Sequence, residues 1–262
     1  MPSLARITVY PIKSLDGCDV TDAAVLPSGA LANDRRWAIV DAQSRLINGK
    51  RTPAVHQIRS SYADNFATVT FSVAGHGESR SFDLAQESPK IAQWLGDFLQ
   101  TKCRLTENPD GGFPDDADAA GPTLVSTASL ALAATWYEGI ELAEMRRRIR
   151  ANLEIDASAP FWEDRLADDG VAPRVFTVGE VQYRGRTICQ RCPVPTRDSR
   201  SGAAIAGFAR AFADHRQQTL PSWSPRAAFD HFYRLAINTS PGWIPDGAKL
   251  QVGDELKLML DG

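Results

Sequence analysis

Hydrophobic and polar residues alternate along several short stretches of the chain, as they do in a β-strand with one buried face. The first such stretch covers residues 5–11 and follows directly on the N-terminus. Glycine, asparagine and aspartate, which favour turns, separate these stretches from one another. The other predicted strands cover residues 36–40, 67–73, 175–178, 250–252 and 255–259.

Apolar residues spaced three and four positions apart predict several helices. The clearest spacing lies in residues 88–100, where the apolar face is formed by Ile91, Trp94, Leu95, Phe98 and Leu99. Ser126 is expected to cap a second helix that ends near Gly139. A charged helix should then follow over residues 141–149. Weaker patterns predict helices at 203–214 and 225–233.

Residues 107–122 are rich in proline, glycine and aspartate and predict a loop or linker. We therefore expect two domains, residues 1–106 and 123–262, joined by this loop. The strand and helix patterns do not alternate as in a parallel α/β sheet, and there is no glycine-rich phosphate loop. The predicted fold class is mostly β (α+β), in two modules with peripheral helices.

The composition is that of an ordinary globular protein, with 43% hydrophobic and 23% charged residues. A net charge of −3 argues against non-specific binding to nucleic acid, which needs a basic surface. No apolar stretch approaches the roughly 18 residues that span a bilayer, and the N-terminus has no secretory signal pattern. We expect a cytoplasmic protein with no membrane or nucleic-acid partner.

The chemistry most open to interpretation lies in Cys189-Gln190-Arg191-Cys192, two of the four cysteines of the chain. A zinc site needs about four ligands, and the other cysteines and the histidines form no second short-spaced pair. A thioredoxin-like pair needs a helix start inside a βα unit, which the pattern does not predict. Two ordinary thiols, or one thiolate that binds a soft metal beside arginines 186, 191 and 197, remain as alternatives.

The wider context of the pair resembles a known family. Arg191-Cys192, followed by Thr196, Asp198 and Gly202, is similar to the arginine–cysteine segment of the MOSC domain. That domain occurs in the mitochondrial amidoxime-reducing component and in bacterial reductases of N-hydroxylated bases. Here Pro193 and Pro195 replace the aliphatic and threonine residues of the animal pattern, which changes the backbone hydrogen bonds expected in this loop.

Further segments along the chain resemble the same family, and their order adds specificity that each segment alone lacks. The resemblance implies a β-barrel MOSC domain preceded by an N-terminal β-barrel-like domain. It also implies that the chain binds the molybdenum cofactor, a pterin dithiolene with a terminal phosphate. The matching segments are Tyr10-Pro11-Ile12-Lys13-Ser14, Asn33-Asp34-Arg35-Arg36-Trp37, residues 124–130, residues 148–153, the acidic pair Glu163-Asp164 with Phe161, and residues 250–254.

By this resemblance Cys192 is the molybdenum ligand, whereas Cys189 matches a position that does not bind the metal. Asp198 is expected either to accept hydrogen bonds near the metal or to fix the loop as an Asx turn. Arg191 and Thr196 of the same segment are expected among the cofactor-binding residues.

The remaining expected contacts suit an anionic heterocyclic ligand. Lys13 can meet the phosphate as a point charge, Ser14 as a hydroxyl donor and Arg35 as a rigid fork. Without the resemblance, Lys13 and Arg35 would be taken as solvated surface charges.

The segments that begin and end the predicted helices complete the expected site. Thr127 and Ser129 lie at a helix start, which suits an anion. The alternative for this helix start is plain N-capping, with Ser126 as the cap. Arg150 and Asn152 are expected to hydrogen-bond the pterin. The alternative for Arg150 is a cation that complements a helix dipole.

The resemblance implies a molybdenum-dependent oxidoreductase that removes oxygen from N-hydroxylated small molecules. The sequence shows neither a ferredoxin cysteine set nor a nucleotide-binding fingerprint. Electrons are therefore expected from a separate flavin or iron–sulfur protein. The alternative function is a carrier of the molybdenum cofactor or of sulfur, without substrate turnover.

Overall fold

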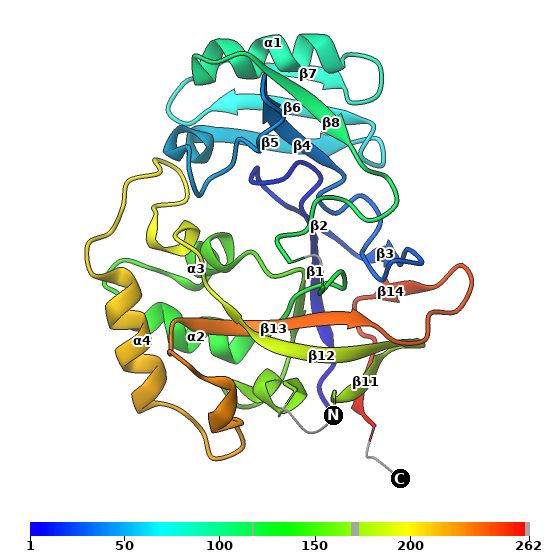
Figure 1. The fold of residues 1–262 in the computed structure, drawn as a ribbon, viewed down its shortest axis with the longest axis vertical. Helices are drawn as coiled ribbons and strands as arrows, with labels where there is room; N and C mark the ends of the chain where they lie inside the picture. The colour runs from blue at the N-terminus through cyan, green and yellow to red at the C-terminus, as the bar shows by residue number, and fades with distance from the viewer. Residues whose placement is uncertain (117, 169–172, 260–262) are drawn as a thin grey trace.

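The computed structural model describes residues 1–116, 118–168 and 173–259. A large curled sheet carries helices along its side, and a smaller β-rich module packs at one end, drawn at the top of Figure 1. The strands of the large sheet, in spatial order, are β15 (Leu256–Leu258), β11 (Val175–Val178), β12 (Val181–Gln190), β13 (Arg234–Pro241), β9 (Leu124–Ser126), β10 (Leu153–Ile155), β1 (Leu4–Val9) and β2 (Cys18–Val20).

The small module is formed by residues 37–107. It contains one two-stranded sheet, one three-stranded sheet and the helix that covers them (Figure 1). Its elements are β4 (Trp37–Asp41), η1 (Pro53–Gln57), β5 (Ile58–Ala63), β6 (Thr68–Val73), β7 (Ser79–Asp83), α1 (Ser88–Leu99) and β8 (Cys103–Glu107). The apolar face of α1 packs on these strands, with Ile91 and Leu95 fully buried in the module's core.

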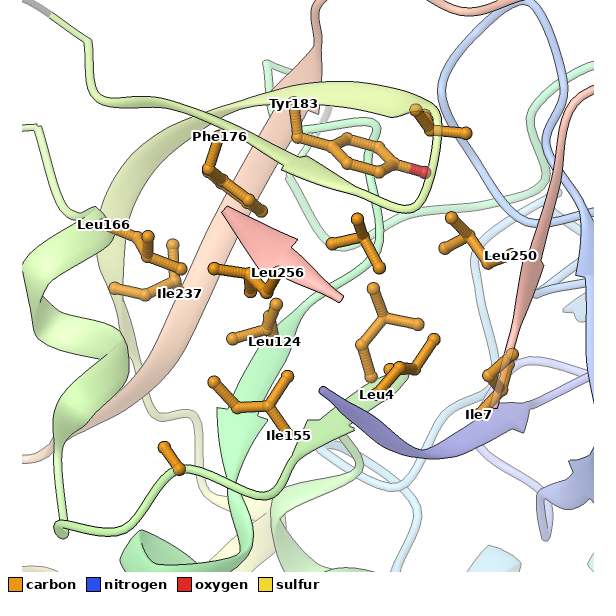
Figure 2. Close-up of a cluster of buried hydrophobic side chains, with 14 of the residues drawn as sticks. Leu4, Ile7, Leu124, Ile155, Leu166, Phe176, Tyr183, Ile237, Leu250 and Leu256 are labelled. Atoms are coloured by element: carbon orange, nitrogen blue, oxygen red, sulfur yellow. The ribbon is translucent and has the colours of Figure 1, made fainter. Parts of the chain in front are cut away.

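The rest of the described chain forms the large module around its own core. Besides the large sheet, it contains β3 (Asp22–Ala24), β14 (Lys249–Gln251), α2 (Thr127–Thr135), α3 (Leu142–Ile149), η2 (Trp162–Leu166), η3 (Val194–Thr196), α4 (Phe208–Gln218) and η4 (Arg226–Ala228). Figure 2 shows side chains from β1, β9, β10 and β13 meeting in one cluster, among them Leu4, Leu124, Ile155 and Ile237. Each such fully buried side chain contributes roughly 1.5–3 kcal/mol to folding.

The two modules interleave along the sequence. The first strand, β1, lies inside the large sheet between β10 and β2, although the rest of the N-terminal region continues into the small module. In the same way β3 pairs with β14, which lies near the C-terminus. The N-terminal segment therefore ties the two modules together, and residues 10–16 cross from one to the other.

The predicted mostly β (α+β) fold class is confirmed. Among the described residues, the strand order of the large sheet runs from β15 to β2 without a continuous ladder that closes it into a barrel. The start of β1 nevertheless meets the segment that leads into β15. β2 pairs only with the last three residues of β1. The residues before them form an isolated bridge between Ser3 and Glu255, and the Leu4 amide donates to the Asp254 carbonyl at 2.8 Å.

Most predicted elements are confirmed, with corrected ends. The strands predicted at 67–73 and 175–178 are β6 and β11, and the helix predicted at 88–100 is α1. Ser126 caps α2, accepting a hydrogen bond from the Ser129 amide at 3.1 Å. However, α2 ends at Thr135, before Gly139.

The prediction of a helix at 225–233 is wrong. Only the short 3₁₀ helix η4 forms there, and Phe229 leaves it with extended backbone angles. Its ring instead stacks on Phe232 at 5.2 Å between centroids, and both rings pack against the large core. Tertiary burial of two aromatic rings therefore outweighs a weak helical pattern.

Candidate functional site

A polar cavity of about 690 Å³ lies between the two modules. Its volume is in the usual range for small-molecule and cofactor sites. The wall is formed by the end of β1 with the crossing segment that follows it, the turn before η1, the loop after β8, the end of α3, and the loop after β12. Segments far apart in the sequence therefore meet at one site.

The described wall of this cavity is positively charged, although the whole chain is slightly acidic. Eleven lysine and arginine residues line it, against five aspartate and glutamate residues. The contrast with a net charge of −3 for the chain shows that cations are concentrated here. Such a wall favours an anionic ligand.

The end of β12 and the loop that follows it carry the cysteine pair. Cys189 is the second-last residue of the strand, and Cys192 lies just beyond it; both residues are half-buried and line the cavity. Pro193 and Pro195 then lead the chain into η3. Because Gly202 has a positive φ of 75° and lies against the Pro53 carbonyl, where a Cβ would be only 2.3 Å away, the loop packs tightly on the small module.

The structure places Arg191 beside Cys189 rather than beside Cys192. Its Nη1 donates to the Cys189 sulfur at 3.2 Å, and the guanidinium also donates to the Ile149 carbonyl. Its buried Nε has no partner among the described residues. Arg191 therefore connects the cysteine loop to the end of α3.

Lys13, Ser14 and Arg35, which the resemblance implies as cofactor-binding residues, all line the cavity. Lys13 is only 6% exposed, and its ammonium donates to the carboxylate of Asp115 and to the Phe113 carbonyl, both at 2.7 Å. Burial lowers the pKa of Lys13, while Asp115 opposes this shift.

Arg35 is held by two groups. Its guanidinium forms an ion pair with Asp34 and donates to the Asn152 side-chain oxygen at 3.2 Å. Burial disfavours its charge, but the carboxylates of Asp34 and Asp115 outweigh burial and raise the pKa of Arg35.

Arg150 and Asn152 also line the cavity, next to Tyr10. Arg150 ends α3 in a left-handed conformation with φ of 56°, which turns the chain toward the cavity. Its guanidinium lies 4.2 Å from the Tyr10 ring centroid and donates to the Leu15 carbonyl at 2.7 Å. Burial lowers the pKa of Arg150 and raises the pKa of Tyr10 to about 12.

Thr127 and Ser129 do not lie on the described cavity wall. The Thr127 hydroxyl donates to Glu154 at 2.7 Å. Ser129 is fully buried, donates to Glu163 at 2.9 Å and accepts from the Phe161 amide. Their polar groups are thus occupied inside the protein, and the helix start is capped by Ser126, which was the alternative.

Thr196 and Asp198 likewise lie off this wall. The Thr196 hydroxyl donates to the Pro193 carbonyl at 2.7 Å. The Asp198 carboxylate accepts from the amides of Arg200 and Ser201 and from the Ser201 hydroxyl, which is the pattern of an Asx turn. Burial alone would raise the pKa of Asp198, but these hydrogen bonds outweigh it and lower the pKa.

The cavity also contains functional candidates that the sequence motifs did not single out. Arg146 donates twice to Glu154, at 2.7 and 2.6 Å, and both residues line the wall. Lys50 and Asp115 face each other at 3.1 Å. No short motif marks these residues, and residues 107–122, which contain Asp115, were predicted only as a loop or linker.

The described residues contain no group of three or more histidine, cysteine, aspartate or glutamate side chains arranged to hold a metal ion. The zinc interpretation of the cysteine pair therefore finds no support in the described part of the chain. A metal that binds here through a single cysteine would need its other ligands from outside the protein. Nor is any helix in that part long and apolar enough to cross a membrane.

Comparison with known proteins adds two findings. Residues 1–102 match the family model of the MOSC N-terminal beta barrel domain. The chain is also 25% identical over 231 residues to the molybdenum cofactor sulfurase of Drosophila erecta, and 22% identical over 263 residues to that of Danio rerio.

These alignments cover 77% and 82% of this chain but only 28% and 30% of the two relatives. The chain thus spans less than a third of the length of the curated relatives it matches. The family match and these similarities agree with the resemblance found in the sequence: the N-terminal part of the chain is similar to the MOSC N-terminal domain, and most of the chain is similar to the molybdenum cofactor sulfurases.

Proposed function

We propose that this protein binds the molybdenum cofactor in the cavity between its modules, with Cys192 as the ligand to the metal, and reduces N-hydroxylated small molecules there. The observation that carries the proposal is the convergence of a half-buried cysteine with a wall of lysine and arginine side chains. A family match at residues 1–102 and relatives named for this cofactor support it.

The residues of the cavity fit this cofactor. The cofactor has three parts to be bound. Its anionic phosphate needs charged donors, its pterin heterocycle needs paired donors and acceptors, and its metal takes a thiolate ligand. The wall supplies the cations Lys13, Arg35 and Arg150, and Arg191 keeps a buried Nε without a described partner. Cys192, one of the two cysteines that line the cavity, suits a metal whose other ligands arrive with the cofactor.

In the proposed mechanism the chain binds and orients, while the cofactor, when bound, supplies the two-electron oxygen-atom chemistry. Lys13 and Arg35 neutralise the anionic end of the ligand. Asn152, fixed by its bond to Arg35 and by donation to the Thr8 carbonyl at 3.1 Å, presents its amide with little freedom to rotate. The ion pair of Arg146 with Glu154 offers fixed polar groups to a substrate in the same cavity.

We further propose that electrons come from a separate flavin or iron–sulfur protein, and that the substrates are small amidoximes, hydroxylamines or N-hydroxylated bases. The purified protein with NADH alone should then show no turnover. A chemically reduced dye should drive reduction of an amidoxime. Turnover with NADH and no second protein would contradict this part of the proposal.

The decisive measurement is metal content by mass spectrometry after expression in a host that makes the cofactor. The wild type should carry molybdenum near one atom per chain, and Cys192→Ala should lose it. Cys189→Ala is the matched control, because its thiol lines the same cavity three residues earlier. No molybdenum in the wild type, or equal loss in both variants, would reject the assignment of Cys192.

A second candidate function is a carrier of the cofactor or of sulfur, which the sulfurase relatives favour. A carrier would bind molybdenum through Cys192 but reduce no oxygen donor, even with a chemical reductant. The dye-driven assay therefore separates the two functions in a preparation shown to contain the metal.

A further inference from the structure

The carboxylate of Asp115 occupies the most basic corner of the cavity. One of its oxygens accepts from the Lys13 ammonium at 2.7 Å and from the Lys50 ammonium at 3.1 Å. Arg35 lies close enough to Asp115 for this carboxylate to raise the pKa of the Arg35 guanidinium. Three cations from three segments thus converge on one carboxylate of the chain itself.

Lys13 needs an anion at this position. Its side chain is almost fully buried, and an ammonium removed from water is costly unless a partner of opposite charge compensates it. Its second contact, the Phe113 carbonyl, is neutral. Among the described residues, Asp115 supplies the negative charge.

The segment before Asp115 is fixed in place. The Phe113 amide donates to the Arg35 carbonyl at 2.9 Å. Gly112 has a positive φ of 66° and lies so close to the backbone that a Cβ would be 2.4 Å from the Asp34 carbonyl oxygen. The chain therefore delivers Asp115 to one defined position.

The Asp115 side chain itself is easier to move than its backbone. It is 55% exposed, whereas the side chain of Lys13 is 7% exposed. Rotation of the carboxylate into water would leave the two lysines where they are. The backbone amide of Lys50 donates to the Asn48 side-chain oxygen at 3.1 Å. This turn holds Lys50 at the edge of the cavity.

We propose that Lys50 and Lys13 form a binding site for a phosphoryl group, and that Asp115 is an internal substitute which fills this site until the ligand displaces it. A phosphoryl group has more charge and more acceptor oxygens than a carboxylate, so it can bond both ammonium groups more strongly. The inference rests on the proposed function, since the phosphoryl group in question is the terminal one of the cofactor.

The first test uses inorganic phosphate as the probe and the cofactor-free protein, made in a host that cannot synthesise the cofactor. Calorimetric titration at low salt should show about tenfold tighter phosphate binding by Asp115→Asn than by the wild type, because the internal competitor is lost. Asp116→Asn is the matched control: it removes the same charge one residue later, and Asp116 has no bond to either lysine among the described contacts.

Equal effects of the two asparagine variants, or no change in Asp115→Asn, would overturn the proposal. If Asp115→Asn does not fold, Lys50→Met provides an independent test. It should weaken phosphate binding several-fold, whereas Lys90→Met, an exposed lysine on α1, should leave it unchanged. Unchanged binding in Lys50→Met would equally overturn the proposal.

The second test identifies the source of the phosphoryl group and keeps the two proposals separable. In a cofactor-competent host, Lys50→Met should contain several-fold less molybdenum than the wild type, at equal folded protein. Unchanged molybdenum in Lys50→Met would reject the cofactor as the source. A different result is that the variants change phosphate binding as expected while the protein never contains molybdenum in any host. That result would reject the proposed function but support the phosphoryl-binding site.

Discussion

Two regions of this molecule bury charged side chains, and they do so in different ways. In the cavity, lysine and arginine outnumber the acidic groups, and the wall is reached by solvent. Beneath α4, the fully buried Arg216 pairs with Asp164 of η2, which also accepts from Ser224. The Arg216 guanidinium lies 3.7 Å from the Phe161 ring centroid.

The second region continues one residue along η2. Glu163 is fully buried and accepts from Ser129. Burial raises the pKa of Glu163 to about 7, and the neighbouring charge of Asp164 adds to the shift. None of these residues lines the cavity. We refer to Ser129, Glu163, Asp164, Arg216 and Ser224 as the buried cluster.

The comparison teaches that the balance of charge separates the two regions. In the buried cluster, the charge of Arg216 is balanced by Asp164 inside the fold, although some buried polar atoms of these side chains have no hydrogen-bond partner among the described residues. The cluster connects α2, η2 and α4. In the cavity, the excess of cations leaves charge to be balanced by a ligand. Mutations should therefore affect stability in the cluster and binding in the cavity.

The largest effect is expected for Arg216→Met. The change leaves Asp164 buried without its charged partner, which costs about 3–5 kcal/mol of unfolding free energy. Urea denaturation monitored by circular dichroism measures this loss. Arg210→Met on the same helix is the control, since that side chain is 90% exposed and should cost almost nothing. A loss below about 1 kcal/mol for Arg216→Met would show that the cluster is not a structural ion pair.

The next effect is a pH dependence from Glu163. The folded protein keeps this carboxyl protonated up to a pKa of about 7, against 4.5 for the ordinary group. The folded state therefore binds more protons between these values, and wild-type stability should fall as the pH rises from 4.5 to 7.

Glu163→Gln removes this dependence. The variant should be about as stable as the wild type at pH 4.5 and about 3 kcal/mol more stable than the wild type above pH 7. Thermal or urea unfolding at a series of pH values tests this, with the exposed Glu180→Gln as the control. Parallel stability curves for wild type and Glu163→Gln would contradict the assigned shift.

In the cavity, Arg150→Met should act mainly on the ligand. The variant loses one charged donor, so molybdenum content under limiting cofactor should fall about tenfold. Its unfolding free energy should change by only about 1 kcal/mol, because removing a desolvated cation offsets the lost bond to the Leu15 carbonyl. A large loss of stability with full metal content would reverse the contrast between the two regions.

The smallest effect is expected for Thr127→Val. Its hydroxyl bonds to Glu154 and lies off the cavity wall, so we expect a loss of about 1 kcal/mol in stability and no change in molybdenum content. Ser14→Ala is the comparison, because Ser14 lines the cavity and its loss should lower the metal content. Reduced metal in Thr127→Val would favour the motif-based assignment of this residue to the cofactor.

The sequence by itself determined the local elements and the resemblance to a family. Alternating and helical patterns predicted β6, β11 and α1, because strand and helix periodicities come from the backbone and are readable without tertiary contacts. The segments around Lys13, Arg35, Arg150 and Cys192 carried the resemblance, and the structure brings all four residues to one cavity.

Other features depended on contacts between distant segments, which no local pattern contains. Thr127 and Ser129 belong to a matching motif, but the fold places Glu154 and Glu163 within reach of their hydroxyls and so occupies them internally. The guanidinium of Arg191 is directed to Cys189 by its bond to the Ile149 carbonyl at the end of α3.

The same reason explains why the strand order of the large sheet and the contacts of Asp115 were not anticipated. β1 pairs with β10, and its first residues bond to the segment before β15; both partners lie far from β1 in the chain. Asp115 meets Lys13 across 102 residues of sequence and Lys50 across 65. Its side-chain type was readable from the sequence, but its partners were decided by the packing of the two modules, because an ion pair forms only where the fold brings both charges within a few ångströms.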